Sequence, residues 1–400
     1  MQRQLDLVFV CDTTGSMGAY LESAKRNIKK IVMKVRDSEK IDFRFALVEY
    51  KDHNPGDEFA FRSYGWRVDL KDMIKDVNKM HADGGGDGPE SVACALKCAS
   101  ELGYRTYAAK VIVWIADAPP HGLGGDSDNF EDGCPCKADF QEVVLDCVNK
   151  DIQIYSIAAE ILGFKYLRSL MRATSMITGG NFIPLASADS LGDVVIAGSL
   201  EEVGMTQMIQ VIQRRIESME GFETFTQEKK DEILRQELAE ATQKTTFKQI
   251  EVKSIYKGDL PKIPEIFFTA KNMKELKKGL KKVKESEVEL TKEFQNFGGG
   301  MYMPPTINME MCTEKFVEYK SVLPDDAMEE EYAKEKPVEK VVEKVIEKTE
   351  EKEVKMEMEI PKEETKEFKD GEVVRITEKA LDDEHQNKII DRLRRKLMKK

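Results

Sequence analysis

Short runs of β-branched and aromatic residues alternate with helical stripes through the first half of the chain. These runs predict strands at residues 5–11, 43–50, 59–68, 110–115, 152–158 and 181–185. Between them, apolar residues recur every three or four positions, which predicts helices near residues 17–35, 70–80, 90–102, 140–148 and 164–177. Strands that alternate with helices favour a mostly parallel sheet covered on both faces. The predicted fold is therefore α/β and doubly wound.

The pattern becomes more polar after residue 200, where 84 of 200 residues are charged, against 52 of the first 200. Helices are predicted near residues 205–219, 228–242 and 273–284. The repeat PVEKVVEKVIEK places like charges four residues apart, which weakens an isolated helix and predicts a disordered linker. The predicted organisation is a domain at 1–200, a helical or mixed accessory region at 201–328, a Lys/Glu-rich linker at 329–370 and a basic amphipathic tail at 371–400.

Composition excludes several classes of protein. The net charge of −12 argues against a general nucleic-acid binder, which needs a basic surface. The longest apolar run, residues 111–116, is far shorter than the roughly 20 residues of a membrane span. The amino terminus has no secretory signal pattern, so the seven cysteines are expected to be reduced thiols and the protein to be cytoplasmic.

Three acidic clusters follow predicted strands or lie in loops at the same edge of the predicted sheet. Asp12-Thr13-Thr14-Gly15-Ser16 comes directly after the first strand, GGGDGPE (84–90) opens a helix, and Asp117 follows VIVWIA. Because the carboxyl ends of parallel strands share one rim, these side chains are expected to converge. Carboxylate and hydroxyl oxygens suit Mg²⁺, Mn²⁺ or Ca²⁺ rather than zinc.

These motifs resemble those of the von Willebrand factor A domain. DTTGSM resembles the Asp-x-Ser/Thr-x-Ser signature of its metal-ion-dependent adhesion site (MIDAS), and IADAPPHG resembles the A domains attached to atypical alpha-kinases. GGGDGPE resembles the Asp-x-Pro-Glu form found in the A domains of integrin β chains, in which the glutamate is the ligand. The resemblance covers residues 4–197 and implies that the ion is held by Asp12, Thr14, Ser16, Glu90 and Asp117, with Asp87 as a further candidate.

The resemblance implies a protein-binding module in which an Asp or Glu of a partner completes the coordination of the metal. Three carboxylates bring a charge of −3 against +2, so we expect tight metal binding and selective, weak capture of an acidic partner group. No catalytic turnover is expected.

Two alternatives remain open from the sequence. The first is a relative of the alpha-kinases with serine/threonine kinase activity, although residues 201–400 contain no nucleotide-binding glycine motif beside a strand. The second is an A fold used only as a scaffold, with the metal incidental. Each acidic or hydroxyl segment, taken alone, is also compatible with simple helix capping.

Three further features are also interpreted. Cys134, Cys136 and His121 form a second candidate metal set, which lacks a fourth ligand for zinc. Cys94 and Cys98 are predicted to be small core residues of one helix. The basic tail at 388–400 offers a weak membrane-surface or calmodulin-type contact, or packs on an acidic protein surface.

Overall fold

The computed structural model describes most of the first 284 residues and two segments near the C-terminus. The described ranges are 3–37, 41–53, 57–123, 128–159, 164–184, 188–242, 247–252, 260–284, 374–379 and 383–397. The predicted Lys/Glu-rich linker at 329–370 lies outside these residues.

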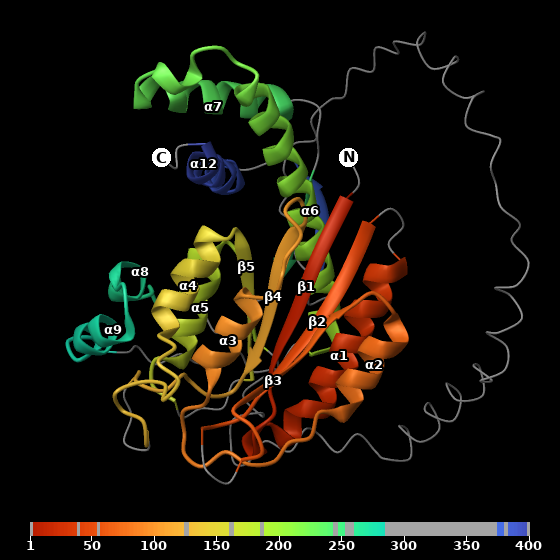
Figure 1. Ribbon diagram of the computed structural model, residues 1–400, viewed down its shortest axis with the longest axis vertical. Helices are drawn as coiled ribbons and strands as arrows, with labels where there is room; N and C mark the ends of the chain where they lie inside the picture. The colour runs from red at the N-terminus through yellow and green to blue at the C-terminus, as the bar shows by residue number, and fades with distance from the viewer. Residues whose placement is uncertain are drawn as a thin grey trace, which may run out of the picture. The chain divides into compact units, whose positions relative to one another are not determined.

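A six-stranded sheet forms the centre of the fold (Figure 1). Its strands are β1 (Arg3–Asp12), β2 (Ile41–Tyr50), β3 (Phe61–Arg67), β4 (Ala109–Ala116), β5 (Ile152–Ala158) and β6 (Phe182–Pro184). They lie in the order β3-β2-β1-β4-β5-β6, and every neighbouring pair is parallel except β2 and β3. This arrangement confirms the predicted doubly wound, mostly parallel sheet, with one antiparallel edge strand.

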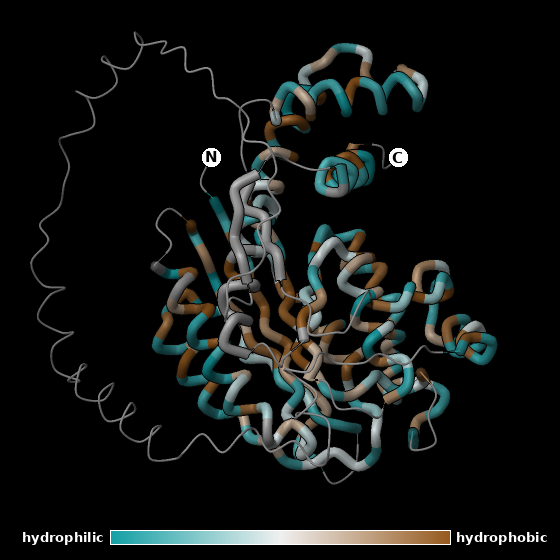
Figure 2. Tube along the Cα trace, turned by 180° about the vertical axis from the view of Figure 1, so that it is seen from behind, coloured by the Kyte–Doolittle hydropathy of each residue, from teal (hydrophilic) through white to brown (hydrophobic). Residues whose placement is uncertain are grey.

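Helices cover both faces of the sheet. One face packs against α1 (Gly18–Asp37), α2 (Leu70–Lys79) and α6 (Ala188–Glu217), and the other against α3 (Val92–Ser100), α4 (Phe140–Asn149) and α5 (Leu167–Thr178). Because side chains alternate along a strand, Leu7 and Phe9 enter the first core while Val8 and Val10 enter the second. Figure 2 shows the hydrophobic residues concentrated along the central strands. None of the described helices combines the length and apolar composition that a membrane crossing requires.

Helix α6 runs through residue 200 and carries a third apolar cluster beyond the sheet. Its Ile209 and Ile212 pack with Leu234 of α7 (Gln227–Thr242) and with Ile389 and Leu393 of α12 (Asp383–Leu397). All five side chains are buried. The apolar residues of the predicted basic tail are therefore covered within the chain, which argues against the membrane-surface or calmodulin-type contact.

Two pairs of smaller elements complete the described part of the chain. Strand β7 (Phe247–Val252) pairs antiparallel with β8 (Val374–Lys379), so segments more than 120 residues apart in sequence lie side by side. The short helices α8 (Ile266–Thr269) and α9 (Met273–Leu280) pack against α5 and α4. The accessory region thus adds apolar surface to the second core of the sheet.

Candidate metal centre

The first segment of the centre is the turn that follows β1. Asp12 is the last residue of the strand, and Thr14 donates both its backbone N–H and its hydroxyl to Asp12 Oδ1, at 2.9 and 2.6 Å. The hydroxyls of Thr14 and Ser16 lie 3.1 Å apart at the start of a short 3₁₀ turn (Gly15–Met17). These contacts place three oxygen-bearing side chains on one side of the turn.

A glycine-rich loop brings Glu90 against this turn. Gly15 N–H donates to the Gly84 carbonyl at 3.0 Å, which joins the two segments through their backbones. Gly85 has a φ of +83°, and a Cβ there would lie 3.1 Å from Glu90 Oε1 and 3.3 Å from Thr14 Cβ. Only glycine combines this left-handed backbone with so close an approach, so Gly85 allows Glu90 and Thr14 to be neighbours.

Asp117 lies at the end of the strand next to β1. It directly follows β4, which pairs with β1, and is completely buried. Glu90 N–H donates to the Pro119 carbonyl at 2.9 Å, which fastens the glycine-rich loop to the loop after β4. The structure therefore brings together Asp12, Thr14, Glu90 and Asp117, as the sequence predicts, with the exposed Ser16 at the margin.

Several carboxylate oxygens at this rim have no hydrogen-bond partner among the described residues. They are Asp12 Oδ2, Glu90 Oε2 and both oxygens of Asp117, all buried. Unpaired buried carboxylate oxygens are costly, because nothing replaces the water that they lose. A bound divalent cation would supply what these atoms lack, so the donor set fits a hard metal ion.

The carboxylates also disfavour one another's ionisation. Burial, together with the charge of Asp117, raises the pKa of Asp12 to about 8. Burial and the charge of Asp12 raise the pKa of Glu90 to about 11, and burial raises that of Asp117 to about 6. The pKa values of neighbouring buried carboxyl groups rise in this way when no positive charge lies among them.

Asp87 lies apart from this set. Its Oδ2 accepts a hydrogen bond from Asn129 N–H at 2.6 Å, and the charges that act on its pKa are those of Asp52, His121 and Asp128. Of the two acidic residues in GGGDGPE, Glu90 is therefore the one whose charge interacts with those of both Asp12 and Asp117.

A buried histidine links two loops beside the centre, a feature that the sequence analysis missed. His121 lies between Asp128, at 3.0 Å from Nδ1, and Asp52, at 2.8 Å from Nε2. Burial alone would lower its pKa, but the hydrogen bonds to both carboxylates raise it to about 9. A charged imidazole thus ties the segment after β2 to the loop after β4.

We expect this histidine to make stability fall with rising pH. Its contribution is fully present below its unfolded pKa of 6.5 and is lost as the pH rises through about 9. The difference corresponds to about 3 kcal/mol. Urea unfolding at pH values below 6.5 and above 9 should show a loss about 3 kcal/mol larger in the wild type than in His121→Gln. The buried carboxylates with raised pKa values, Asp12 and Glu90, add a loss of the same sign to both proteins. His81→Gln, at an exposed histidine, should keep the wild-type dependence, and parallel profiles for His121→Gln and wild type would contradict the assignment.

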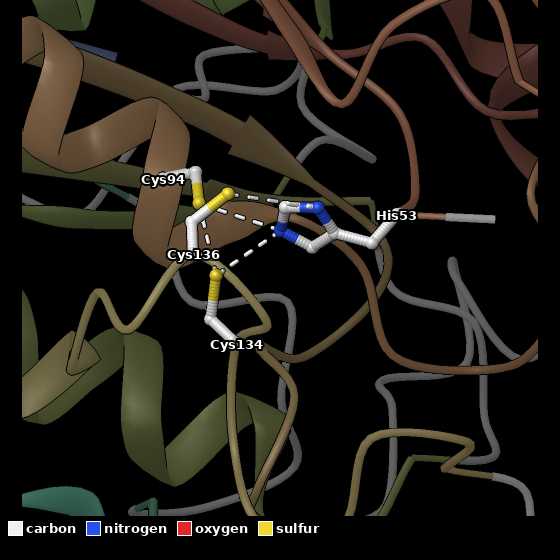
Figure 3. A group of neighbouring side chains, drawn as sticks. All are labelled: His53, Cys94, Cys134 and Cys136. Carbon is white, nitrogen blue, oxygen red and sulfur yellow. Dashed lines mark hydrogen bonds between the residues drawn. The ribbon is translucent and has the colours of Figure 1, made fainter. Parts of the chain in front are cut away.

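The second candidate metal set is corrected by the structure. Cys134 and Cys136 do not gather with His121 but with His53 and Cys94 (Figure 3). Cys94 is therefore more than a core residue, whereas Cys98 lies outside this group of four. The sequence carried no signal for His53, because it lies 41 residues before Cys94 and 81 before Cys134 and no short motif joins them.

Comparisons with known proteins point to one domain family. A family model of the von Willebrand factor A domain matches residues 6–122. Alpha-protein kinase vwkA of Dictyostelium discoideum is 28% identical over 155 residues, which cover 38% of this chain and 24% of that protein. The putative ariadne-like RING finger protein R811 of Acanthamoeba polyphaga mimivirus is 33% identical over 129 residues, which cover 32% of this chain and 12% of that protein.

A third relative is von Willebrand factor A domain-containing protein 7 of Homo sapiens, 37% identical over 93 residues, which cover 23% of this chain and 10% of that protein. The chain thus matches less than a quarter of the length of each of these relatives. The stretch matched by the family model contains most of β1, all of β2 to β4 and all of the converging carboxylates. Residues 6–122 therefore match the von Willebrand factor A domain family.

Proposed function

We propose that the rim oxygens bind a Mg²⁺ ion and that an aspartate or glutamate of a protein partner completes its coordination. The proposed ligands are Asp12, Thr14, Ser16, Glu90 and Asp117. The observation that carries this proposal is the set of buried carboxylate oxygens without hydrogen-bond partners among the described residues, on Asp12, Glu90 and Asp117. The ion would supply the positive charge to which an acidic side chain of the partner binds.

The position of the rim supports access by a partner. The proposed carboxylate ligands are buried, but Gly15 and Ser16 beside them are exposed. Ser16, itself a proposed ligand, thus lies at the surface, where a side chain of another protein can approach the centre. With three carboxylates already present, we expect an acidic group to be captured weakly and selectively.

The relatives support a role in binding rather than turnover. The matched stretch is a minor part of an alpha-protein kinase and of a RING finger protein, two proteins whose names describe different activities. A domain shared by such different proteins is best understood as a recruitment module. In this proposal the chain binds a partner and performs no catalysis.

Titration of the full chain with Mg²⁺, Mn²⁺ and Ca²⁺ by calorimetry tests the metal centre. We expect Asp12→Asn and Glu90→Gln to weaken Mg²⁺ binding by about 10–100-fold, because each removes a charged ligand. Asp42→Asn is the matched control, since Asp42 lies at the opposite end of the sheet and pairs with Arg105. Loss of affinity in the control, or none in the other two, would contradict the assigned ligands.

A displayed peptide library tests the partner. Peptides selected on the full chain in Mg²⁺ should carry a required Asp or Glu, and Asn or Gln at that position should abolish binding. Binding should also disappear when Mg²⁺ is left out of the buffer, without addition of a chelator. It should disappear in Asp12→Asn as well. Selected peptides that bind equally well without Mg²⁺ would favour the scaffold alternative.

A further inference from the structure

Four side chains from three separate segments meet close to the proposed magnesium centre. His53 follows β2, Cys94 lies on α3, and Cys134 and Cys136 flank Pro135 in the segment before α4. One ligand atom from each residue lies within 4.8 Å of the others. Figure 3 shows the three sulfurs gathered around the imidazole ring.

The distances within this cluster are those of neither a disulfide nor ordinary core packing. Cys94 Sγ and Cys134 Sγ lie 2.9 Å apart, well beyond the disulfide length of about 2.05 Å, and all described cysteines are free. His53 Nε2 lies 3.1 Å from Cys134 Sγ and 3.4 Å from Cys94 Sγ, and Cys136 Sγ lies 4.0 Å from the ring at Nδ1.

These spacings match the edges of a small tetrahedron. With Zn–S bonds of about 2.3 Å and Zn–N bonds of about 2.0 Å, ligand atoms on zinc lie about 3.5–3.8 Å apart. The distances given above, from 2.9 to 4.0 Å, lie on both sides of this range, and all four atoms lie within 4.8 Å of one another. Shifts of less than about 1 Å therefore bring all four atoms onto one ion.

We propose that His53, Cys94, Cys134 and Cys136 bind a structural Zn²⁺ ion. Three thiolates and one imidazole form a closed four-ligand set of the kind that zinc occupies without an open position. Soft sulfur ligands also exclude Mg²⁺ and Ca²⁺, which require oxygen. The zinc site and the proposed magnesium centre therefore select different ions and can be tested separately.

The zinc site positions the rim on which the proposed function depends. His53 adjoins Asp52, which contacts His121, and Cys94 lies in the first turn of α3, four residues after Glu90. Cys134 and Cys136 belong to the long segment that begins at Asp117. One ion would thus fasten three segments at this edge, in addition to the apolar contacts that Cys94 and Cys134 make within the core.

Metal analysis of the full chain, purified without chelator from zinc-supplemented cells, tests the proposal. We expect about one zinc per chain in the wild type and less than about 0.2 in Cys136→Ser and Cys134→Ser. Cys136 is exposed, so its replacement opens no core cavity. Cys98→Ser, one turn along α3 from Cys94, and Asp12→Asn should both keep the full zinc content.

Two further measurements identify the geometry and the structural role. Cobalt in place of zinc should give the intense visible bands of tetrahedral coordination with sulfur charge transfer, and these should be lost in Cys136→Ser. Chelation should lower the melting temperature of Asp12→Asn, which lacks a magnesium ligand, by about 10 °C. Wild-type chain with less than about 0.2 zinc, with iron or copper instead, or with an unchanged melting temperature after chelation would overturn the proposal.

Discussion

Replacing Arg392 by alanine is expected to lower the free energy of unfolding by about 3–5 kcal/mol. Arg392 lies on α12 and is only 5% exposed. Its guanidinium contacts Asp151 at 2.6 Å and Glu202 at 2.6 Å and donates to the Thr206 hydroxyl at 3.2 Å. Without it, Glu202 on α6 would remain buried with no partner for its charge among these groups, which is the costly outcome.

The pKa values point the same way. The charges of Arg392 and Lys396 overcome the effect of burial and hold the pKa of Asp151 well below its usual range. The charge of Arg392 lowers the pKa of Glu202, but burial has the larger effect and the pKa is raised. Glu202 therefore depends on this single cation.

Arg394 provides the matched control on the same helix. It makes a two-point contact with Asp231 at 2.8 and 2.9 Å, but both side chains are about one-third exposed. Arg394→Ala should therefore cost less than about 1 kcal/mol in the same urea unfolding measurement. Equal losses for the two variants would show that burial does not set the strength of the Arg392 contacts.

Replacing Trp114 by alanine is expected to cost about 3–5 kcal/mol. Trp114 is the largest fully buried side chain of the described part of the chain and lies on β4. Its ring packs on Phe140 of α4 with centroids 5.7 Å apart, and its indole N–H donates to Tyr50 at 3.2 Å. Alanine would leave a cavity between the sheet and α4 and would deprive Tyr50 of this donor.

The second tryptophan of the chain supplies both the control and the probe. Trp66 is half-buried at the edge strand, where its ring meets Tyr104 and the Arg44 guanidinium. Trp66→Ala should cost about 1–2 kcal/mol. In each variant, the fluorescence of the remaining tryptophan follows unfolding. A smaller loss for Trp114→Ala than for Trp66→Ala would contradict the position of Trp114 at the centre of the core.

The central strands β1, β4 and β5 were predictable because each is buried on both faces and reads as a nearly continuous apolar run. Only the second half of the long helix α6 was predicted, near residues 205–219, because Gly192, Gly198 and Gly204 interrupt the pattern before it. The structure gives the reason for one of them. A Cβ at Gly198 would lie 2.6 Å from the Tyr155 ring, so glycine allows α6 to approach β5 closely. Tertiary packing here outweighs the poor helix propensity of glycine.

The proposed magnesium centre and the proposed zinc site differ in how far they could be predicted from the sequence. Asp12 ends β1 and Asp117 follows the adjacent parallel strand β4, and topology alone brings such positions together. His53, Cys94 and Cys134 come from a loop, a helix and a second loop, whose meeting depends on the path of each loop. Cys94 also occupies the buried side of α3, so its spacing could not distinguish a ligand from a core residue.

The pairing of β7 with β8 changes how the C-terminal segment should be regarded. Residues 374–379 and 383–397 supply a strand and a helix to the same folded unit that contains the sheet. The helix packs on α6 and α7, and the strand pairs with β7. In the sequence, 121 residues separate the end of β7 from the start of β8. Shortening the chain before residue 374 would therefore remove part of the folded unit itself, including the buried cation on which Glu202 depends.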